Sequence, residues 1–123
     1  GTRMFVVGST SDNVHQYDLT QAYDVTTAQF NNVSFSVQSQ EGAPMGMHWN
    51  NDGTRLYVIG YGSDDIFEYD LTQAFDVATA QYNNVKSSGT QVGVNPYGMY
   101  INRDGSKVYV VQRAQPILRY TAT

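Results

Sequence analysis

The chain has 123 residues, a formal net charge of -4 and only 15% charged side chains. This acidic balance repels a phosphate backbone, and no cluster of Lys and Arg offsets it, so nucleic-acid binding is not expected. No apolar run approaches the roughly 20 residues of a membrane-spanning helix, so membrane insertion is not expected. The absence of cysteine excludes disulfides and thiolate metal sites. Abundant Gly and Tyr predict an all-β protein with many turns.

A unit of 52 residues recurs along the chain. GTRMFVVG at residues 1–8 returns as GTRLYVIG at 53–60 and as GSKVYVVQ at 105–112. PMGMHWNNDG at 44–53 returns as PYGMYINRDG at 96–105. Self-similarity at a fixed period is the signature of a repeat architecture.

The first half of the unit predicts a β-hairpin of two strands, named A and B. Strand A is expected at residues 47–50 and again at 99–102. An Asp-Gly pair follows each copy, and Gly accepts the positive φ that a tight hairpin turn requires. Strand B is expected at residues 55–60, with copies at 3–8 and 107–112. Its run from Leu56 to Ile59 has no polar alternation, which indicates a strand buried on both faces.

The second half predicts strands C and D. Strand C is expected at residues 66–69, with copies at 14–17 and 117–120, and strand D at about 81–87. Asp70 followed by Gln73 is a capping-box pattern that predicts a single helical turn between them. The acidic residues of this half recur almost unchanged, and we interpret them as structural rather than catalytic: Asp18, Asp24, Asp70 and Asp76.

Four short antiparallel strands in a repeat of 40 to 55 residues are typical of a β-propeller blade. We therefore predict one partial propeller array over residues 1–123, with about 2.4 blades. Residues 1–42 supply strands B-C-D, residues 43–94 supply A-B-C-D, and residues 95–123 supply A-B-C. Because propellers close with about four to eight blades, the ring is expected to be completed by other copies of the chain, as a homo-oligomer, or by a longer parent chain.

The segments at residues 44–58 and 96–110 read Pro-x-Gly-Met, then Asn-x-Asp-Gly, then an apolar Tyr-Val run. This pattern resembles the repeat of YVTN- and NHL-type propellers, and the resemblance covers the whole chain. It implies a propeller that serves as a lactonase or other hydrolase, as a binding scaffold, or as part of a cell-surface or virion protein. Extracellular, cell-surface or virion placement follows by analogy. Lactonase-like members have channel-lining His, Asp, Glu or Asn ligands, and no such set can be placed here.

One pair of repeat positions differs between the copies. His48 and Trp49 lie on a predicted strand A, the strand that lines the channel of a propeller, and their counterparts are Tyr100 and Ile101. A position that breaks the repeat is a candidate for function. We hypothesise a ligand site formed by His48, Trp49 and Tyr100, in which the ligand stacks on Trp49 and accepts a hydrogen bond from His48. The alternative is packing between neighbouring blades.

Metal and cofactor sites are not predicted. His15 has Phe67 as its counterpart and is interpreted as a blade-face residue, so the two histidines are not a metal pair. Ser63, Asp64 and Asp65 are oxygen-rich enough to suggest Ca²⁺, but a turn whose side chains bond their own backbone explains them better.

Three functions remain open. The first is a non-enzymatic propeller scaffold that binds protein or carbohydrate partners. The second is a lactonase- or hydrolase-like enzyme whose channel site is completed by other blades. The third is a lectin with one sugar site per blade, which predicts the same aromatic and amide side chains at equivalent positions. No catalytic residue is assigned, and a binding role is preferred over catalysis.

Overall fold

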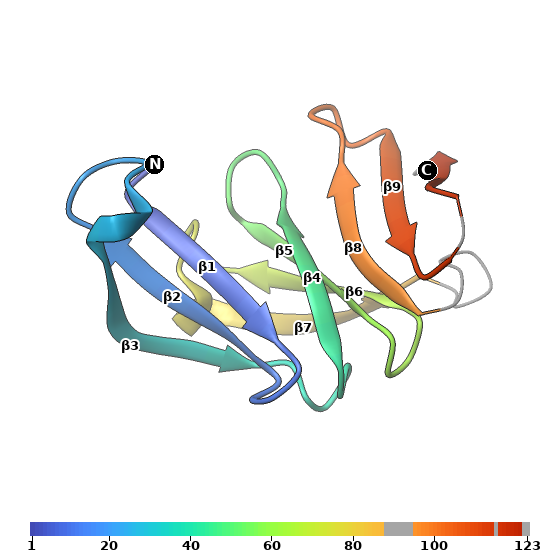
Figure 1. Cartoon of the computed structure of the whole chain (residues 1–123), viewed down its shortest axis with the longest axis horizontal. Coiled ribbons are helices and arrows are strands. Elements are labelled where there is room, and N and C mark those ends of the chain that lie inside the picture. Colours follow the sequence, from blue (N-terminus) through green and yellow to red (C-terminus); the bar gives the residue numbers. More distant parts are fainter. Residues whose placement is uncertain (88–94, 115, 122–123) are drawn as a thin grey trace.

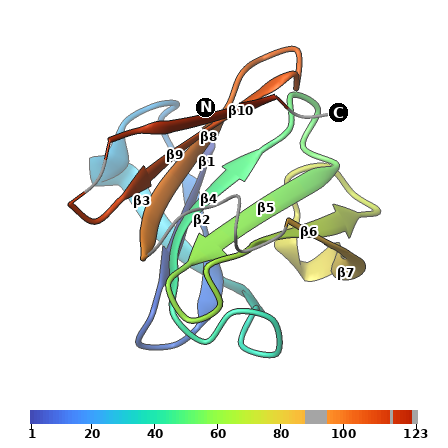
Figure 2. The ribbon, with the colours of Figure 1, turned by 90° about the vertical axis from the view of Figure 1, so that its right-hand side faces the viewer.

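The computed structural model of the chain describes residues 1–87, 95–114 and 116–121. These residues form an all-β structure of three antiparallel sheets that follow one another in chain order (Figure 1). The first sheet has the order β1-β2-β3, with β1 (Arg3–Gly8), β2 (Asn13–Leu19) and β3 (Ala28–Ser36). The second has the order β4-β5-β6-β7, with β4 (Pro44–Trp49), β5 (Arg55–Gly60), β6 (Ile66–Leu71) and β7 (Ala80–Lys86). The third has the order β8-β9-β10, with β8 (Pro96–Ile101), β9 (Lys107–Gln112) and β10 (Leu118–Thr121), and it faces the viewer in Figure 2.

The prediction of an all-β chain is confirmed, whereas the helical turn expected between Asp70 and Gln73 is wrong. Strand β6 continues through Leu71, because Asp70 lies in the ladder opposite Arg55 of β5. The turn forms later, as the 3-10 helix η2 (Val77–Thr79), where the Asp76 side chain accepts the Ala78 N–H. The equivalent helix η1 (Val25–Thr27) precedes β3. In the described part of the chain, no helix has the length and apolar character needed to cross a membrane.

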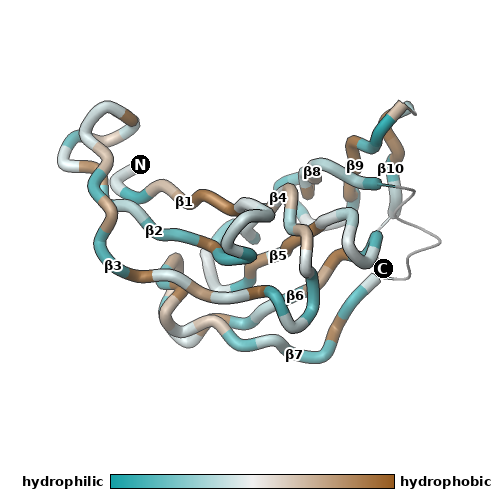
Figure 3. The backbone as a smooth tube through the Cα atoms, turned by 60° about the horizontal axis from the view of Figure 1, so that its bottom comes forward, coloured by the Kyte–Doolittle hydropathy of each residue, from teal (hydrophilic) through white to brown (hydrophobic). Residues whose placement is uncertain are grey.

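Strand β5 is buried on both faces, as its unbroken apolar sequence predicts. Leu56 and Val58 belong to a core cluster with the first sheet, and Ile59 points the other way into a second cluster with Val110 of the third sheet. The hydrophobic stretches of β1 and β5 are visible along the tube in Figure 3. Side chains alternate between the faces of a strand, so one strand contributes to both junctions between the sheets.

The first strands of successive sheets, β1, β4 and β8, approach closely. Strand β4 contacts both β1 and β8. A Cβ atom at Gly46 would lie 2.9 Å from the Cα atom of Gly98, closer than real Cβ atoms come to a backbone atom. The Pro-x-Gly segment therefore supplies a glycine where the backbones of β4 and β8 meet.

Candidate functional site

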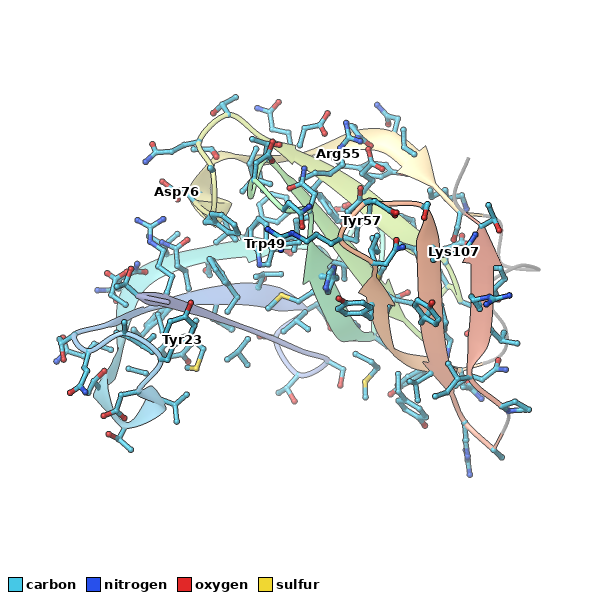
Figure 4. The ribbon with its side chains drawn as sticks, turned by 90° about the horizontal axis from the view of Figure 1, so that it is seen from above. Tyr23, Trp49, Arg55, Tyr57, Asp76 and Lys107 are labelled. Atoms are coloured by element: carbon cyan, nitrogen blue, oxygen red, sulfur yellow. The ribbon has the colours of Figure 1, made fainter. Side chains whose placement is uncertain are left out.

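A cleft lined by aromatic rings lies between the first and second sheets, with a volume of about 440 Å³. The ring of Trp49 lies between those of Phe5 and Phe75, at centroid distances of 4.8 Å and 5.3 Å. The two contacts tilt the rings by 55° each, so the cleft has aromatic surfaces in several orientations. Figure 4 shows Trp49 between the two sheets. The remaining lining residues are Gly1, Thr2, Arg3 and Ala74.

The indole N–H of Trp49 is buried and has no hydrogen-bond partner among the residues that the structure describes. A buried tryptophan usually donates this N–H to an acceptor, and an unpaired buried donor costs about 1–3 kcal/mol. An unsatisfied donor beside an open cleft is therefore suited to an acceptor that a ligand brings.

Phe75 is held beside Trp49 in a strained conformation. Its φ of 56° lies in the left-handed region, which bulky residues rarely adopt. Its N–H donates to the Gly53 carbonyl at 2.9 Å, and its own carbonyl accepts from Arg3 Nη1 at 2.7 Å. The ring also covers Gly53, because a Cβ atom there would lie 2.3 Å from it. These contacts fix one aromatic wall of the cleft.

Arg3 gives the cleft a positive charge. Besides its bond to Phe75, its Nε lies 3.6 Å from an Asp18 oxygen, and both side chains are more than a third exposed. An exposed ion pair of this length contributes little to stability. The guanidinium is thus fixed by a backbone carbonyl while it stays open to solvent.

A second contact joins the second and third sheets. The rings of His48 and Tyr100 meet edge to face at 4.9 Å. Within the described part of the chain, the Nδ1 atom of His48 is buried without a hydrogen-bond partner, and burial lowers the pKa of the imidazole below its usual 6.5. Tyr100 remains half exposed on β8. This pair is positioned to contact a ligand at the surface, or simply to pack two sheets together.

The structure brings two of the three predicted site residues together and separates the third. His48 and Trp49 are neighbours in β4, so their side chains leave opposite faces of the strand. His48 meets Tyr100, whereas Trp49 faces the first sheet. Sequence reasoning missed Phe5 and Phe75 as the partners of Trp49. Side-chain alternation along β4 was the available signal, since it places Trp49 on the face that strand β1 covers.

Three carboxylates outside the cleft, those of Glu41, Asp64 and Asp65, have structural partners. Glu41 is fully buried, and its oxygens accept the N–H groups of Ala43, Gly62 and Ser63 and the Ser63 hydroxyl. Asp65, proposed above as a turn residue, pairs with Lys86 at 2.8 Å, and Asp64 accepts the Asn95 N–H at 3.0 Å. Residues 63–65 therefore direct their side chains to three different places. Within the described ranges, no group of three or more His, Cys, Asp and Glu is arranged to hold a metal ion.

No family model and no curated protein matches the chain. A solved structure does: the crystal structure of a functionally unknown protein from Desulfotomaculum acetoxidans DSM 771 aligns with a TM-score of 0.65 at 14% sequence identity. The alignment covers 97% of this chain and 37% of that one, so the chain spans little more than a third of the length of the protein it resembles. At this identity the likeness concerns the fold alone.

Proposed function

We propose that the chain is a non-enzymatic scaffold of β-propeller type whose ligand site is the Trp49 cleft. The 52-residue repeat and the resemblance to YVTN- and NHL-type propellers support the blade assignment, with each sheet as all or part of a blade. The sheets follow one another along the chain and meet through their first or inner strands, as blades do around an axis. A structure of the same fold that is much longer than this chain is consistent with a ring of more blades.

The unpaired indole N–H of Trp49 carries the proposal. The Trp49 side chain lines a cleft that also offers Phe5, Phe75 and Arg3, and its N–H is buried beside that cleft. Binding sites combine apolar and aromatic walls with a few fixed polar groups in this way. The ligand should have a flat apolar face and an oxygen acceptor, which describes a sugar ring or an exposed loop of a protein partner.

The acidic side chains favour binding over catalysis. Asp24, Asp52 and Asp76 each accept the backbone N–H two residues further along the chain. Hydrogen bonds from Thr26 and Thr54 hold the pKa values of Asp24 and Asp52 below the usual value, so these groups stay charged and occupied. A general base needs a free carboxylate or imidazole within reach of the substrate.

The cleft is not repeated at the next junction. The residues equivalent to Phe5 and Trp49 are Tyr57 and Ile101, which line a groove without an indole. A lectin with one sugar site per blade needs the same side chains in each blade. The observations therefore favour one cleft in these residues over a repeated sugar site.

The fluorescence of Trp49 tests the proposal, because the chain has one tryptophan. The intact chain should be titrated with glucose, galactose and N-acetylglucosamine and with their β-linked disaccharides. We expect a saturable change in emission, and by calorimetry a Trp49→Phe variant should bind about tenfold more weakly because it lacks the N–H donor.

Arg3→Gln should also weaken binding, whereas Arg55→Gln is the matched control, since Arg55 occupies the same repeat position and lies outside the cleft. A flat titration with every sugar would overturn a carbohydrate ligand. Hydrolysis of γ-butyrolactone by the chain, with or without added divalent metal, would overturn the non-enzymatic assignment.

A further inference from the structure

A groove of about 270 Å³ separates the second and third sheets. Strands β6 and β7 form one wall through Ile66, Glu68 and Val85, and strands β8 and β9 form the other through Met99, Ile101 and Val108. The groove is mostly apolar, and it lies where the two sheets diverge. Its place in the fold has an exact counterpart one repeat earlier, between the first and second sheets.

At that earlier junction the equivalent space is filled by the 3-10 helix η2. Val77 of η2 is fully buried, and η2 contacts strands β2 and β3. The Val77 N–H donates to the Gln16 side-chain oxygen at 3.1 Å. At the first junction, η2 of the second sheet therefore packs on the first sheet through the buried Val77 side chain and one hydrogen bond.

The lining of the groove corresponds to the surroundings of Val77. Fifty-two residues before Ile66 and Val108 stand Val14 and Leu56, which belong to the buried core cluster that contains Val77. The same shift from Val85, Met99 and Ile101 gives partly buried residues that pack against that cluster: Val33, Met47 and Trp49.

Glu68 holds the position of Gln16. Its Oε1 already accepts the Asn83 amide at 2.7 Å and lies 3.1 Å from Arg55 Nε. A carboxylate has two oxygens and about four acceptor sites, so it retains the capacity to accept the backbone N–H that Gln16 accepts from Val77. The groove therefore has an acceptor side chain at the position of Gln16 as well as apolar walls.

The edge of strand β10 lies in the position that would bind the strand following such a turn. In the second sheet, η2 leads directly into β7, and β7 pairs with β6. Strand β10 takes the place of β6 in the third sheet, and among the described strands it pairs with β9 alone. A strand edge with unpaired N–H and C=O groups is a template for a further strand.

The equivalent 3-10 helix of the first sheet, η1, differs from η2 in its burial. Val25 of η1 occupies the same repeat position as Val77, with the same Asp cap before it, yet it is 65% exposed. The sequence therefore repeats a turn that is buried where a preceding sheet lies beside it and exposed where none does.

We infer that the groove and the β10 edge together bind one further copy of the segment found at residues 76–87, a 3-10 turn of Asp-Val-x-Thr-Ala type followed by a strand. Its valine enters the groove, its valine N–H donates to Glu68, and its strand pairs with β10. This inference rests on the proposed blade arrangement, because the repeat relates the two junctions.

The test is binding of a synthetic peptide with the sequence of residues 76–87 to the 123-residue chain, measured by calorimetry. We expect saturable binding with one site, and at least about tenfold weaker binding for the same peptide with aspartate in place of its valine. The Val85→Arg variant fills the groove with a charged side chain and should lose at least about tenfold in affinity. The matched control is Val111→Arg, because Val85 is 50% exposed and lines the groove, whereas Val111 is 49% exposed and does not.

No binding of the peptide, or equal binding to the Val85→Arg variant, would overturn the inference. Light scattering on the same samples tests whether a second copy of the chain occupies the groove. Self-association of the chain that Val85→Arg abolishes would assign the groove to a second copy and overturn the added strand. Failure here is distinct from failure of the Trp49 proposal, because the groove does not include Trp49 and the peptide titration does not use its fluorescence.

Discussion

The two junctions between sheets are built from equivalent strands but closed to different degrees. The first junction holds a cluster of nine buried hydrophobic residues, whereas the cluster at the second, counted over the described residues, holds only Ile59 and Val110. The first has η2 over it, and the second has an open groove in the same place. At the first junction, the turn before the last strand of the following sheet therefore covers the core between the two sheets.

The junctions also differ in the residues that face each other. At the first, Trp49 contacts both Phe5 and Phe75, and the Phe75 ring covers Gly53. At the second, the residues equivalent to Phe5 and Trp49 are Tyr57 and Ile101, and no atom of the described residues beyond its chain neighbours lies within 4 Å of a Cβ atom built at Gly105. The Trp49 cleft thus depends on side chains that differ between the two junctions, although the backbone is repeated.

The largest expected effect separates Val77 from Val25. Val77→Asp places a carboxylate in the core, where charge is poorly tolerated, and should lower the free energy of unfolding by at least about 4 kcal/mol. Val25→Asp puts the same change at a largely exposed position and should alter it by less than about 0.5 kcal/mol. Urea denaturation of both variants measures the difference. Equal losses would show that η2 does not seal the first junction.

A smaller difference is expected between Gly53 and Gly105. Both have a φ of 75°, so alanine at either position is strained by about 1–2 kcal/mol. At Gly53 the new Cβ atom would also meet the Phe75 ring at 2.3 Å, which should bring the loss to about 3 kcal/mol.

Thermal or urea unfolding of Gly53→Ala and Gly105→Ala gives the comparison directly. The emission of Trp49 should also change in Gly53→Ala, because displacement of Phe75 opens the cleft, and it should stay unchanged in Gly105→Ala. Identical behaviour of the two variants would mean that Phe75 is free to move away from Gly53.

The sequence predicts the strands well because their signals are local. The Asp-Gly turns and the apolar run of β5 place the A–B hairpins, and they appear as β4-β5 and β8-β9. The helical turn predicted at Asp70 forms instead after Asp76, because Asp70 pairs across the sheet with Arg55. The capping pattern of Asp70 and Gln73 is a local signal, and the strand pairing that overrides it is not local.

The candidate site was harder to predict, because it depends on contacts between sheets. Trp49 stood out by breaking the repeat, but its partners Phe5 and Phe75 are 44 and 26 residues away along the chain. The counterpart of Phe75 one repeat earlier is Tyr23, which is also aromatic, so a comparison of the repeats does not single out Phe75 as a site residue. Only the arrangement of the sheets makes Phe75 a wall of the cleft while Tyr23 is 85% exposed.

The smallest effect concerns His48 at the second junction. Burial lowers the pKa of His48 in the folded chain, so between the unfolded value of 6.5 and the lower folded value the unfolded chain binds more protons. The contribution of the neutral ring to stability is thus complete above about pH 6.5 and is lost as the pH falls below it. Its neighbours Tyr57 and Tyr100 are aromatic rings rather than carboxylates, and burial is the main cause of the lowered pKa.

His48→Phe keeps the ring contact with Tyr100 and removes the titration, so it should lose less stability than the parent chain between pH 7 and pH 5. The difference should stay below about 1 kcal/mol because the ring is only partly buried. Urea denaturation at the two pH values measures it, and an unchanged pH slope in the variant would show that His48 does not titrate differently on folding.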